Sequence, residues 1–126
     1  MSQPGSALPL GPVFTWSREH QGLIYTAGHA AVDVDDLKLD PGPFEHEARK
    51  TLENLQRTVE RAGSNMDSVL KVTVYLTDMG DFRAFNTIYA QFFRGPVVPA
   101  RTCIEVSRLP YNFRVEVEAV AAVASE

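Results

Sequence analysis

The stretch 44–63 constrains this chain most, because its apolar residues follow the period of an α-helix. They recur at intervals of four, four, three, four and three residues and so form one stripe: Phe44, Ala48, Leu52, Leu55, Val59 and Ala62. Pro43 suits a first turn, and the helix dipole favours Glu45 and Glu47 there. Gly63 suits the end of the helix. The sequence therefore predicts an amphipathic helix that covers another layer of structure.

Segments rich in β-branched and aromatic residues flank this helix and predict five strands. Residues 19–22 are a plausible hairpin connection between the first two strands, and the acidic, proline-containing stretch 33–43 predicts a solvated loop before the helix. In the third strand one face is wholly apolar, because Leu70, Val72, Val74 and Leu76 alternate with other residues. The predicted strands are 13–17, 22–34, 68–77, 100–107 and 113–122.

A second helix is predicted after Asp81, which can cap its first turn, and before Gly95-Pro96, which would end it. Its inner side is crowded with aromatic residues: Phe82, Phe85, Tyr89, Phe92 and Phe93. Aromatic residues at helical spacing bury a large area, so we interpret them as core rather than as a ligand site.

The order β, β, α, β, α, β, β predicts an α+β fold with a mixed sheet and both helices on one face. The 126 residues suffice for one domain, which we place at 11–124 after an irregular lead-in over residues 1–10. The helices would leave the other face of the sheet uncovered and apolar. Exposed apolar patches usually mark interfaces, so we expect a homo-oligomer with a cleft between subunits.

Composition excludes several classes of function. With 12 Lys and Arg against 16 Asp and Glu, the net charge of −4 argues against nucleic acid and acidic membranes as partners. A single cysteine, Cys103, excludes an intramolecular disulfide and zinc sites built on paired cysteines, and no histidine has a metal-binding partner at the usual spacing. Motifs of hydrolase triads, NTPases and dinucleotide enzymes are absent. Because the chain shows neither a signal peptide nor a membrane span, we expect a cytoplasmic protein.

Arg101 is the first candidate for chemistry, since a planar guanidinium matches a carboxylate. In a strand, Arg101 and Cys103 would project to one face. Alternatively, Arg101 pairs with Glu105 or another neighbour at the surface. Cys103 has no histidine near it in sequence, so it is either a nucleophile or inert packing.

Two carboxylates and an amide complete the set of candidates from the residues alone. Glu116 and Glu118 share one face of the last strand, where burial could raise a pKa and let a carboxylate activate water. They could equally form the solvent side of the strand or pair with another subunit. Asn86 in the second helix could contact a ligand or satisfy a backbone carbonyl.

Four segments then resemble one family in order and at nearly the right spacing. TLENLQRTVERAG, VLKVTVYLTDMGDFRAFNTIYAQFF, PARTCIEVSRLP and VEVEA look like the Rid (YjgF-like) family of reactive-intermediate deaminases, and the resemblance spans roughly residues 11–124. The stretch PARTCIEVSRLP is its most specific part. The resemblance implies a chorismate-mutase-like α+β fold, a homotrimer with three clefts between subunits, and hydrolysis of 2-imino acids to 2-keto acids and ammonia without cofactor or metal.

The resemblance also implies roles for individual residues. Arg101 would hold the substrate carboxylate, Glu116 would deprotonate the attacking water, and the backbone of Cys103 would steady the imine nitrogen. Asn86 would face the cleft. Val13 and Ala27 stand at substrate-binding positions where well-known members carry tyrosine and serine.

These departures make the pocket less polar, so a small imino acid is not the only substrate that fits the sequence. His29 replaces a glutamine of the family, and it is either a proton-transfer group or a surface residue. A larger or more apolar imino acid is possible. Other readings are a deaminase specific to one pathway, with a conjugated enamine such as 2-aminomuconate, and a trimer that binds small acids without turnover. The family has also been linked to RNA cleavage, but this sequence has no stripe of basic residues that would support that activity.

Overall fold

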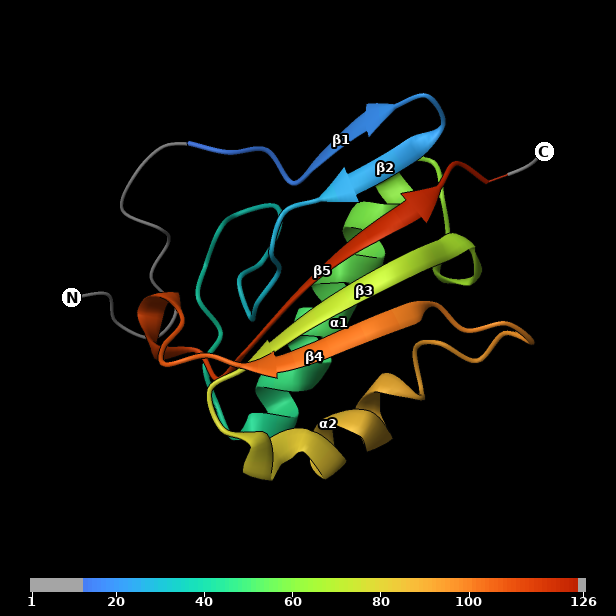
Figure 1. The fold of residues 1–126 in the computed structure, drawn as a ribbon. Coiled ribbons are helices and arrows are strands. Elements are labelled where there is room, and N and C mark those ends of the chain that lie inside the picture. The colour runs from blue at the N-terminus through green and yellow to red at the C-terminus, as the bar shows by residue number, and fades with distance from the viewer. Residues whose placement is uncertain (1–12, 125–126) are drawn as a thin grey trace.

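The computed structural model describes residues 13–124 and arranges five strands and two helices as the sequence order predicts (Figure 1). The lead-in expected over residues 1–10 lies outside the described residues. The strands are β1 (Ser17–His20), β2 (Leu23–Thr26), β3 (Val69–Leu76), β4 (Ala100–Glu105) and β5 (Val115–Ala122). The helices are α1 (Phe44–Arg61) and α2 (Phe82–Tyr89), with short 3-10 turns at Met66–Ser68 (η1), Met79–Asp81 (η2) and Pro110–Asn112 (η3).

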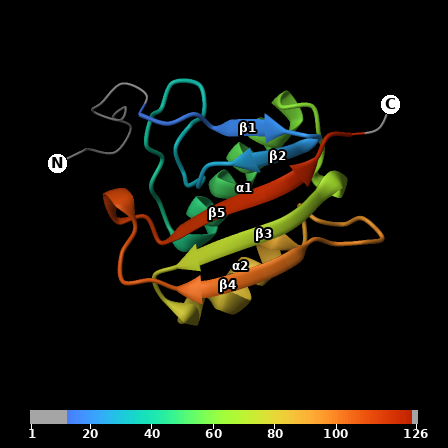
Figure 2. The same ribbon diagram turned by 45° about the horizontal axis from the view of Figure 1, so that its top comes forward.

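The sheet has the order β1-β2-β5-β3-β4, which Figure 2 shows from the strand side. Every neighbouring pair is antiparallel except β3 and β4, which run parallel. A parallel pair needs a crossover, and α2 lies in the segment that joins β3 to β4. The mixed sheet of the sequence prediction is confirmed.

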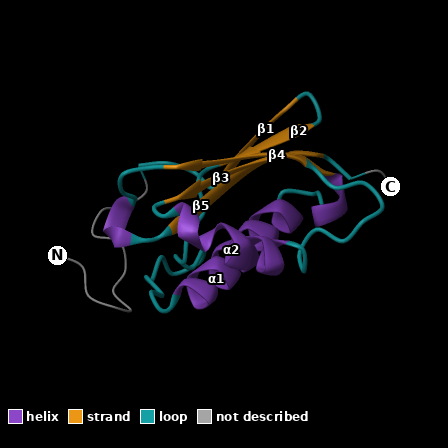
Figure 3. Cartoon of the chain, turned by 60° about the horizontal axis from the view of Figure 1, so that its bottom comes forward, coloured by secondary structure: helices purple, strands orange, loops and turns teal. Residues whose placement is uncertain are grey.

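Both helices lie on one side of the sheet, as Figure 3 shows. The predicted stripe of α1 packs against this side, with Ala48, Leu52, Leu55 and Val59 fully buried. Opposite it are inward-facing residues of β3 and β5, among them Val72, Val74, Val115 and Val117. The helix ends at Arg61, and Gly63 follows with a φ of 100°, a conformation that glycine adopts readily. No helix within residues 13–124 has the length and apolar character to cross a membrane.

The first hairpin begins later than predicted. Strand β1 covers Ser17–His20 rather than residues 13–17, because the turn consists of Gln21 and Gly22 alone. Both turn residues have positive φ, 52° and 81°, which is the geometry of a tight two-residue hairpin turn. The prediction placed the connection two residues too early and so displaced the strand.

The second strand is much shorter than the predicted 22–34. After β2 ends at Thr26, the hydroxyl of Thr26 accepts a hydrogen bond from Ala119 N, so a side chain replaces the backbone partner there. Pairing with β5 returns only at an isolated bridge between His29 and Val117. Residues 33–43 form a loop as predicted, but it is not wholly solvated, since Leu39 is buried.

Helix α2 ends at Tyr89, earlier than Gly95-Pro96 predicts. Beyond it the chain tightens into i to i+3 hydrogen bonds, such as Phe92 N to Tyr89 O. Asp81 occupies the N-cap position, but its side chain makes no capping hydrogen bond. The core interpretation of the aromatic residues is confirmed for Phe85 and Phe93, which are buried.

The uncovered face of the sheet is not the wholly apolar surface expected from the sequence. Strands β3, β4 and β5 present hydrogen-bonded polar pairs on this face: Lys71 Nζ donates to Thr102 Oγ1 at 2.9 Å, and Tyr75 OH donates to Glu118 Oε1 at 2.7 Å. Leu70, predicted to face inward, is 51% exposed because the pairing of β3 with β5 is irregular between Val69 and Lys71.

Candidate functional site

Arg101 lies near the start of β4 and projects to the helix side of the sheet. Its partner in the register is Val72, which is fully buried under the helices. The guanidinium carbon lies over three rings of α2: 4.8 Å from the centroid of Tyr89, 5.5 Å from Phe82 and 5.9 Å from Phe85. Aromatic faces attract a cation and leave its N–H edge available for hydrogen bonds.

The surface ion pair considered for Arg101 does not form among residues 13–124. Glu105 instead accepts a hydrogen bond from Met79 N at 2.8 Å, and Arg101 makes no salt bridge or side-chain hydrogen bond with a described residue. Beside it on α2, Asn86 Oδ1 and Tyr89 OH are buried and also lack a partner in the described part of the chain. One edge of α2 and β4 thus holds a half-buried cation and two polar atoms that find no partner in the part of the chain that the structure describes.

Cys103 follows Arg101 on the same face of β4, as predicted. The side chain is half-buried and packs against the main core. Burial raises the pKa of the thiol, and the charge of Arg101 opposes this effect only in part. A thiol that stays protonated is a poor nucleophile, which favours the packing interpretation of its side chain.

Glu116 lies on the face of the sheet opposite to Arg101. Glu118 shares this face with Glu116, two residues further along β5, as predicted. The Glu116 carboxylate is half-buried and lies directly over Gly28, where an added Cβ would come within 2.2 Å of Glu116 Oε2. A side chain at position 28 would therefore displace the Glu116 carboxylate from this place. Burial raises the pKa of Glu116, and the neighbouring charge of Glu118 raises it further.

A hollow of about 160 Å³ opens beside Glu116. Its walls are mainly aromatic and aliphatic, and Glu116 is its one charged residue among Phe14, Trp16, Gly28, Ala30, Val32, Pro110, Tyr111, Phe113 and Glu116. Sequence reasoning found Glu116 but missed the wall residues, because they come from three separate segments. No periodic signal connects those segments.

The predicted site residues do not meet within one subunit. Arg101, Cys103 and Asn86 belong to the helix side at β4 and α2, whereas Glu116 and its hollow lie on the other side of the sheet. Val13 is 80% exposed. Ala27 directly precedes Gly28 of the hollow, and its carbonyl oxygen accepts hydrogen bonds from Thr26 Oγ1 and His29 Nδ1.

His29 is neither a surface residue nor a free proton-transfer group. It is fully buried, and its Nδ1 lies 2.8 Å from Ala27 O, which only accepts, so Nδ1 carries the proton. Nε2 then accepts a hydrogen bond from Thr58 Oγ1 at 2.7 Å. Burial lowers the pKa of His29 to about 4, against a smaller raising effect of the Ala27 hydrogen bond. The residue ties the segment after β2 to helix α1.

A neutral buried histidine makes folding stability depend on pH. Between pH 6.5 and about 4 the unfolded chain binds a proton that folded His29 refuses, so stability falls as the pH falls through this window. The shift corresponds to about 3 kcal/mol at its full extent. We expect His29→Gln, followed by denaturant unfolding at pH 7 and pH 4.5, to lose less stability on acidification than wild type. His20→Gln, at an exposed histidine, should behave like wild type; equal pH dependence in all three proteins would contradict the assignment.

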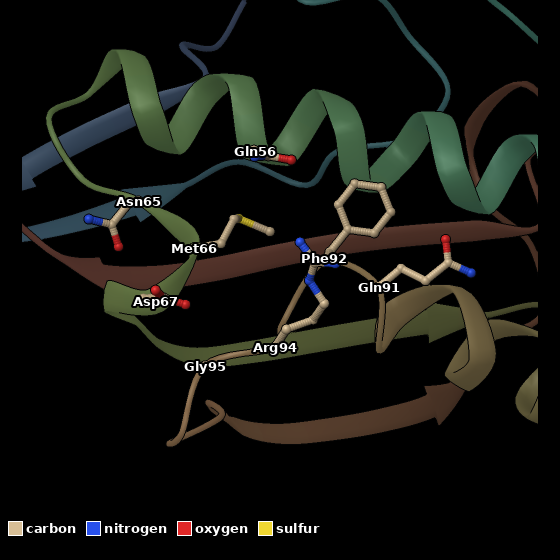
Figure 4. Close-up of a pocket in the computed structure, with 8 residues that line it drawn as sticks. All are labelled: Gln56, Asn65, Met66, Asp67, Gln91, Phe92, Arg94 and Gly95. Atoms are coloured by element: carbon tan, nitrogen blue, oxygen red, sulfur yellow. The ribbon is translucent and has the colours of Figure 1, made fainter.

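A second hollow, of about 400 Å³, lies on the helix side between α1, η1 and the segment after α2 (Figure 4). Its lining is mostly polar, with Asp67 and Arg94 as the charged members. None of the predicted site residues lines it. Within the described residues no group of three His, Cys, Asp or Glu side chains is placed to hold a metal ion.

Residues 8–123 match the protein family described as Endoribonuclease L-PSP. A RutC family protein of Synechocystis is 39% identical over 116 residues, which is 91% of this chain and 88% of that protein. The chain belongs to the Rid (YjgF/RutC) family. The resemblance inferred from its motifs is therefore confirmed.

Other Rid relatives carry an activity in their names. A protein of Dermatophagoides farinae named 2-iminobutanoate/2-iminopropanoate deaminase is 31% identical over 98% of this chain and 94% of its own length. A mouse protein of the same name is 41% identical over 78% of this chain and 72% of its own. The family thus includes imine deaminases.

Solved structures of the family confirm the fold. A Rid-family protein of Yersinia pestis has a TM-score of 0.84 at 30% identity, covering 97% of this chain and 96% of its own. E. coli TdcF, solved with bound serine, has a TM-score of 0.82 at 30% identity, covering 98% and 97%.

Proposed function

We propose that this protein is a homotrimeric deaminase that hydrolyses 2-imino acids to 2-keto acids and ammonia. The observation that carries the proposal is the pairing of two half-sites. An arginine without an ionic partner among residues 13–124 lies on one side of the sheet, and a half-buried carboxylate in an apolar hollow lies on the other. Each half-site is incomplete in one subunit.

A second copy of the chain would complete the site. Arg101 and Glu116 lie on opposite faces of one sheet, so a cleft that uses both must take one residue from each of two subunits. An interface of this kind joins two different surface patches, and three such contacts close into a ring when the rotation is 120°. The trimer expected from the family resemblance has this symmetry and contains three clefts.

Binding would begin with the carboxylate of the imino acid. The guanidinium of Arg101 can donate two parallel hydrogen bonds to it, while the three rings beneath hold the guanidinium in place. Asn86 on α2, whose Oδ1 is buried without a hydrogen-bond partner among the described residues, would be a further polar contact. Anchoring the carboxylate fixes the adjacent carbon, C2, with respect to the opposite wall of the cleft.

The chemical step would then use Glu116. Its carboxylate takes a proton from water as the water oxygen bonds to C2 of the protonated imine, forming a tetrahedral amino alcohol. The proton passes from Glu116 to the nitrogen. The C–N bond then breaks as the hydroxyl proton returns to the Glu116 carboxylate and the C=O bond forms. The 2-keto acid leaves, and ammonia takes the proton from Glu116 and leaves as ammonium. The raised pKa of Glu116 makes this carboxylate a stronger base than an exposed one, and therefore better able to take the proton.

Cys103 would contribute through its backbone. Its thiol is held protonated by burial, and its side chain packs into the core. A nucleophilic thiolate is not required by this mechanism, because water attacks the imine directly. In this proposal the imine nitrogen is steadied by the backbone of Cys103, which lies two residues from Arg101 on the edge strand β4.

The proposal is tested by generating imino acids with an amino-acid oxidase and following their conversion in the presence of semicarbazide, which traps imines that escape hydrolysis. Wild-type protein should suppress trapping and release ammonia and keto acid faster than the uncatalysed reaction. Light scattering should give the mass of a trimer. If keto acids bind but no imine is hydrolysed faster than in buffer, the protein is a small-acid binder.

A further inference from the structure

We infer that the cleft accepts 2-imino acids with bulky apolar side chains, aromatic or branched, in preference to small or hydroxylated ones. This inference rests on the proposed function and concerns the hollow beside Glu116. The relatives of Dermatophagoides farinae and mouse are named for two small imino acids, 2-iminobutanoate and 2-iminopropanoate. The walls of this hollow indicate a different side chain.

The size of the hollow suits a ring or a branched alkyl group. Its volume is about 160 Å³, and a dry cavity of about 150 Å³ lined by aliphatic and aromatic residues is able to hold benzene. A methyl or ethyl side chain would leave most of this space unfilled, and empty space in an apolar site forfeits contacts on one side.

The walls offer little to a polar side chain. Trp16 is the residue whose ring N–H could have donated a hydrogen bond, but Nε1 is already engaged with Val34 O at 3.1 Å. Val32 and Phe113 present only carbon atoms and are buried. A hydroxyl placed against Val32 and Phe113 would lose water without gaining a partner there, which is unfavourable. The polar side-chain groups that remain in the lining are the carboxylate of Glu116, which the proposed reaction uses as its base, and the hydroxyl of Tyr111, a residue that is 42% exposed.

The aromatic wall is also fixed in position. The ring of Trp16 lies 4.7 Å from the ring of His29, and Phe14 meets Trp16 edge-on at 5.0 Å. His29 itself is buried and held by hydrogen bonds at both ring nitrogens. A wall held in this way does not collapse around a small substrate, so the preference for a large one is built into the scaffold.

Two matched pairs of substrates test the inference on the wild-type protein. Imino acids made from valine and threonine have nearly the same shape and differ by a hydroxyl, and those made from phenylalanine and alanine differ in size. With oxidase rates matched, we expect kcat/KM to be about tenfold to a hundredfold higher for the valine and phenylalanine products. Equal values, or higher values for the threonine and alanine products, would overturn the inference.

A pair of variants connects the preference to the hollow. Val32→Thr keeps the shape of a lining residue and adds a hydroxyl, so it should lower the valine-to-threonine ratio by roughly threefold to tenfold. Val97→Thr, at an exposed loop position outside the hollow, should leave the ratio unchanged. If Val32→Thr does not fold, Ala30→Ser adds a hydroxyl to the same wall. Absence of turnover with all four imino acids would overturn the proposed deaminase itself, whereas turnover without preference overturns only the specificity.

Discussion

Arg101→Ala is expected to lower kcat/KM for imine hydrolysis by about three orders of magnitude. Two charge-assisted hydrogen bonds to the substrate carboxylate disappear, each worth about 2 kcal/mol, and the substrate is no longer held at C2. Arg101→Lys keeps the charge but loses the planar fork, so it should recover only part of the rate. The measurement is ammonia release from enzymatically generated imines over a range of substrate concentrations.

The control for this variant is Arg94→Ala, which removes an exposed arginine seven residues earlier in the chain. It should keep wild-type kinetics. Loss of the Arg101 guanidinium removes a contact with three rings, and such contacts are worth about 1 kcal/mol, so Arg101→Ala should remain folded and assembled. An Arg101→Ala protein that is trimeric and hydrolyses imines at the wild-type rate would refute the anchor.

Glu116→Gln is expected to reduce kcat by about 10²- to 10⁴-fold while KM changes little, because glutamine fills the same space but accepts no proton. The pH profile provides a second signature. Since burial raises the pKa of Glu116 above its usual range, the wild-type rate should rise with pH through that raised pKa, where the carboxylate becomes ionised. Glu116→Gln should lose this rise.

Glu118→Gln is the matched control, because it changes the neighbouring carboxylate on the same face of β5. Tyr75 donates a hydrogen bond to Glu118, so this carboxylate already has a partner. Removal of its charge takes away one cause of the raised pKa of Glu116. The variant should therefore remain active with its pH profile moved to lower pH. If Glu118→Gln lost more activity than Glu116→Gln, the assignment of Glu116 as the base would be wrong.

The two inactive variants together test whether the site lies between subunits. When Arg101→Ala and Glu116→Gln chains are co-assembled in equal amounts, about a quarter of the clefts combine an intact Arg101 with an intact Glu116. Activity should return to roughly that fraction of wild type. No recovery in verified mixed trimers would mean that both residues act within one subunit, which the opposite faces of the sheet argue against.

Local sequence pattern predicted most of the secondary structure, and it was wrong where side chains replaced backbone pairing or where turns were tighter than expected. The stripe from Phe44 to Val59 and the alternation of Val115 with Glu116 follow directly from the periods of helix and strand. The limits of the first two strands depended on the Gln21-Gly22 turn and on the Thr26 hydroxyl, two features without a periodic signal.

The sequence by itself determined the order of elements, that Arg101 and Cys103 share one face of their strand, that Glu116 and Glu118 share one face of theirs, and the family. Only the tertiary structure placed Arg101 on the rings of α2, buried His29, and built an apolar hollow beside Glu116 from separate segments. The physical reason is that periodicity is a local property of the sequence, which indicates only the direction in which a side chain points from its own helix or strand. The neighbours that set its pKa, its space and its partners come from elsewhere in the chain.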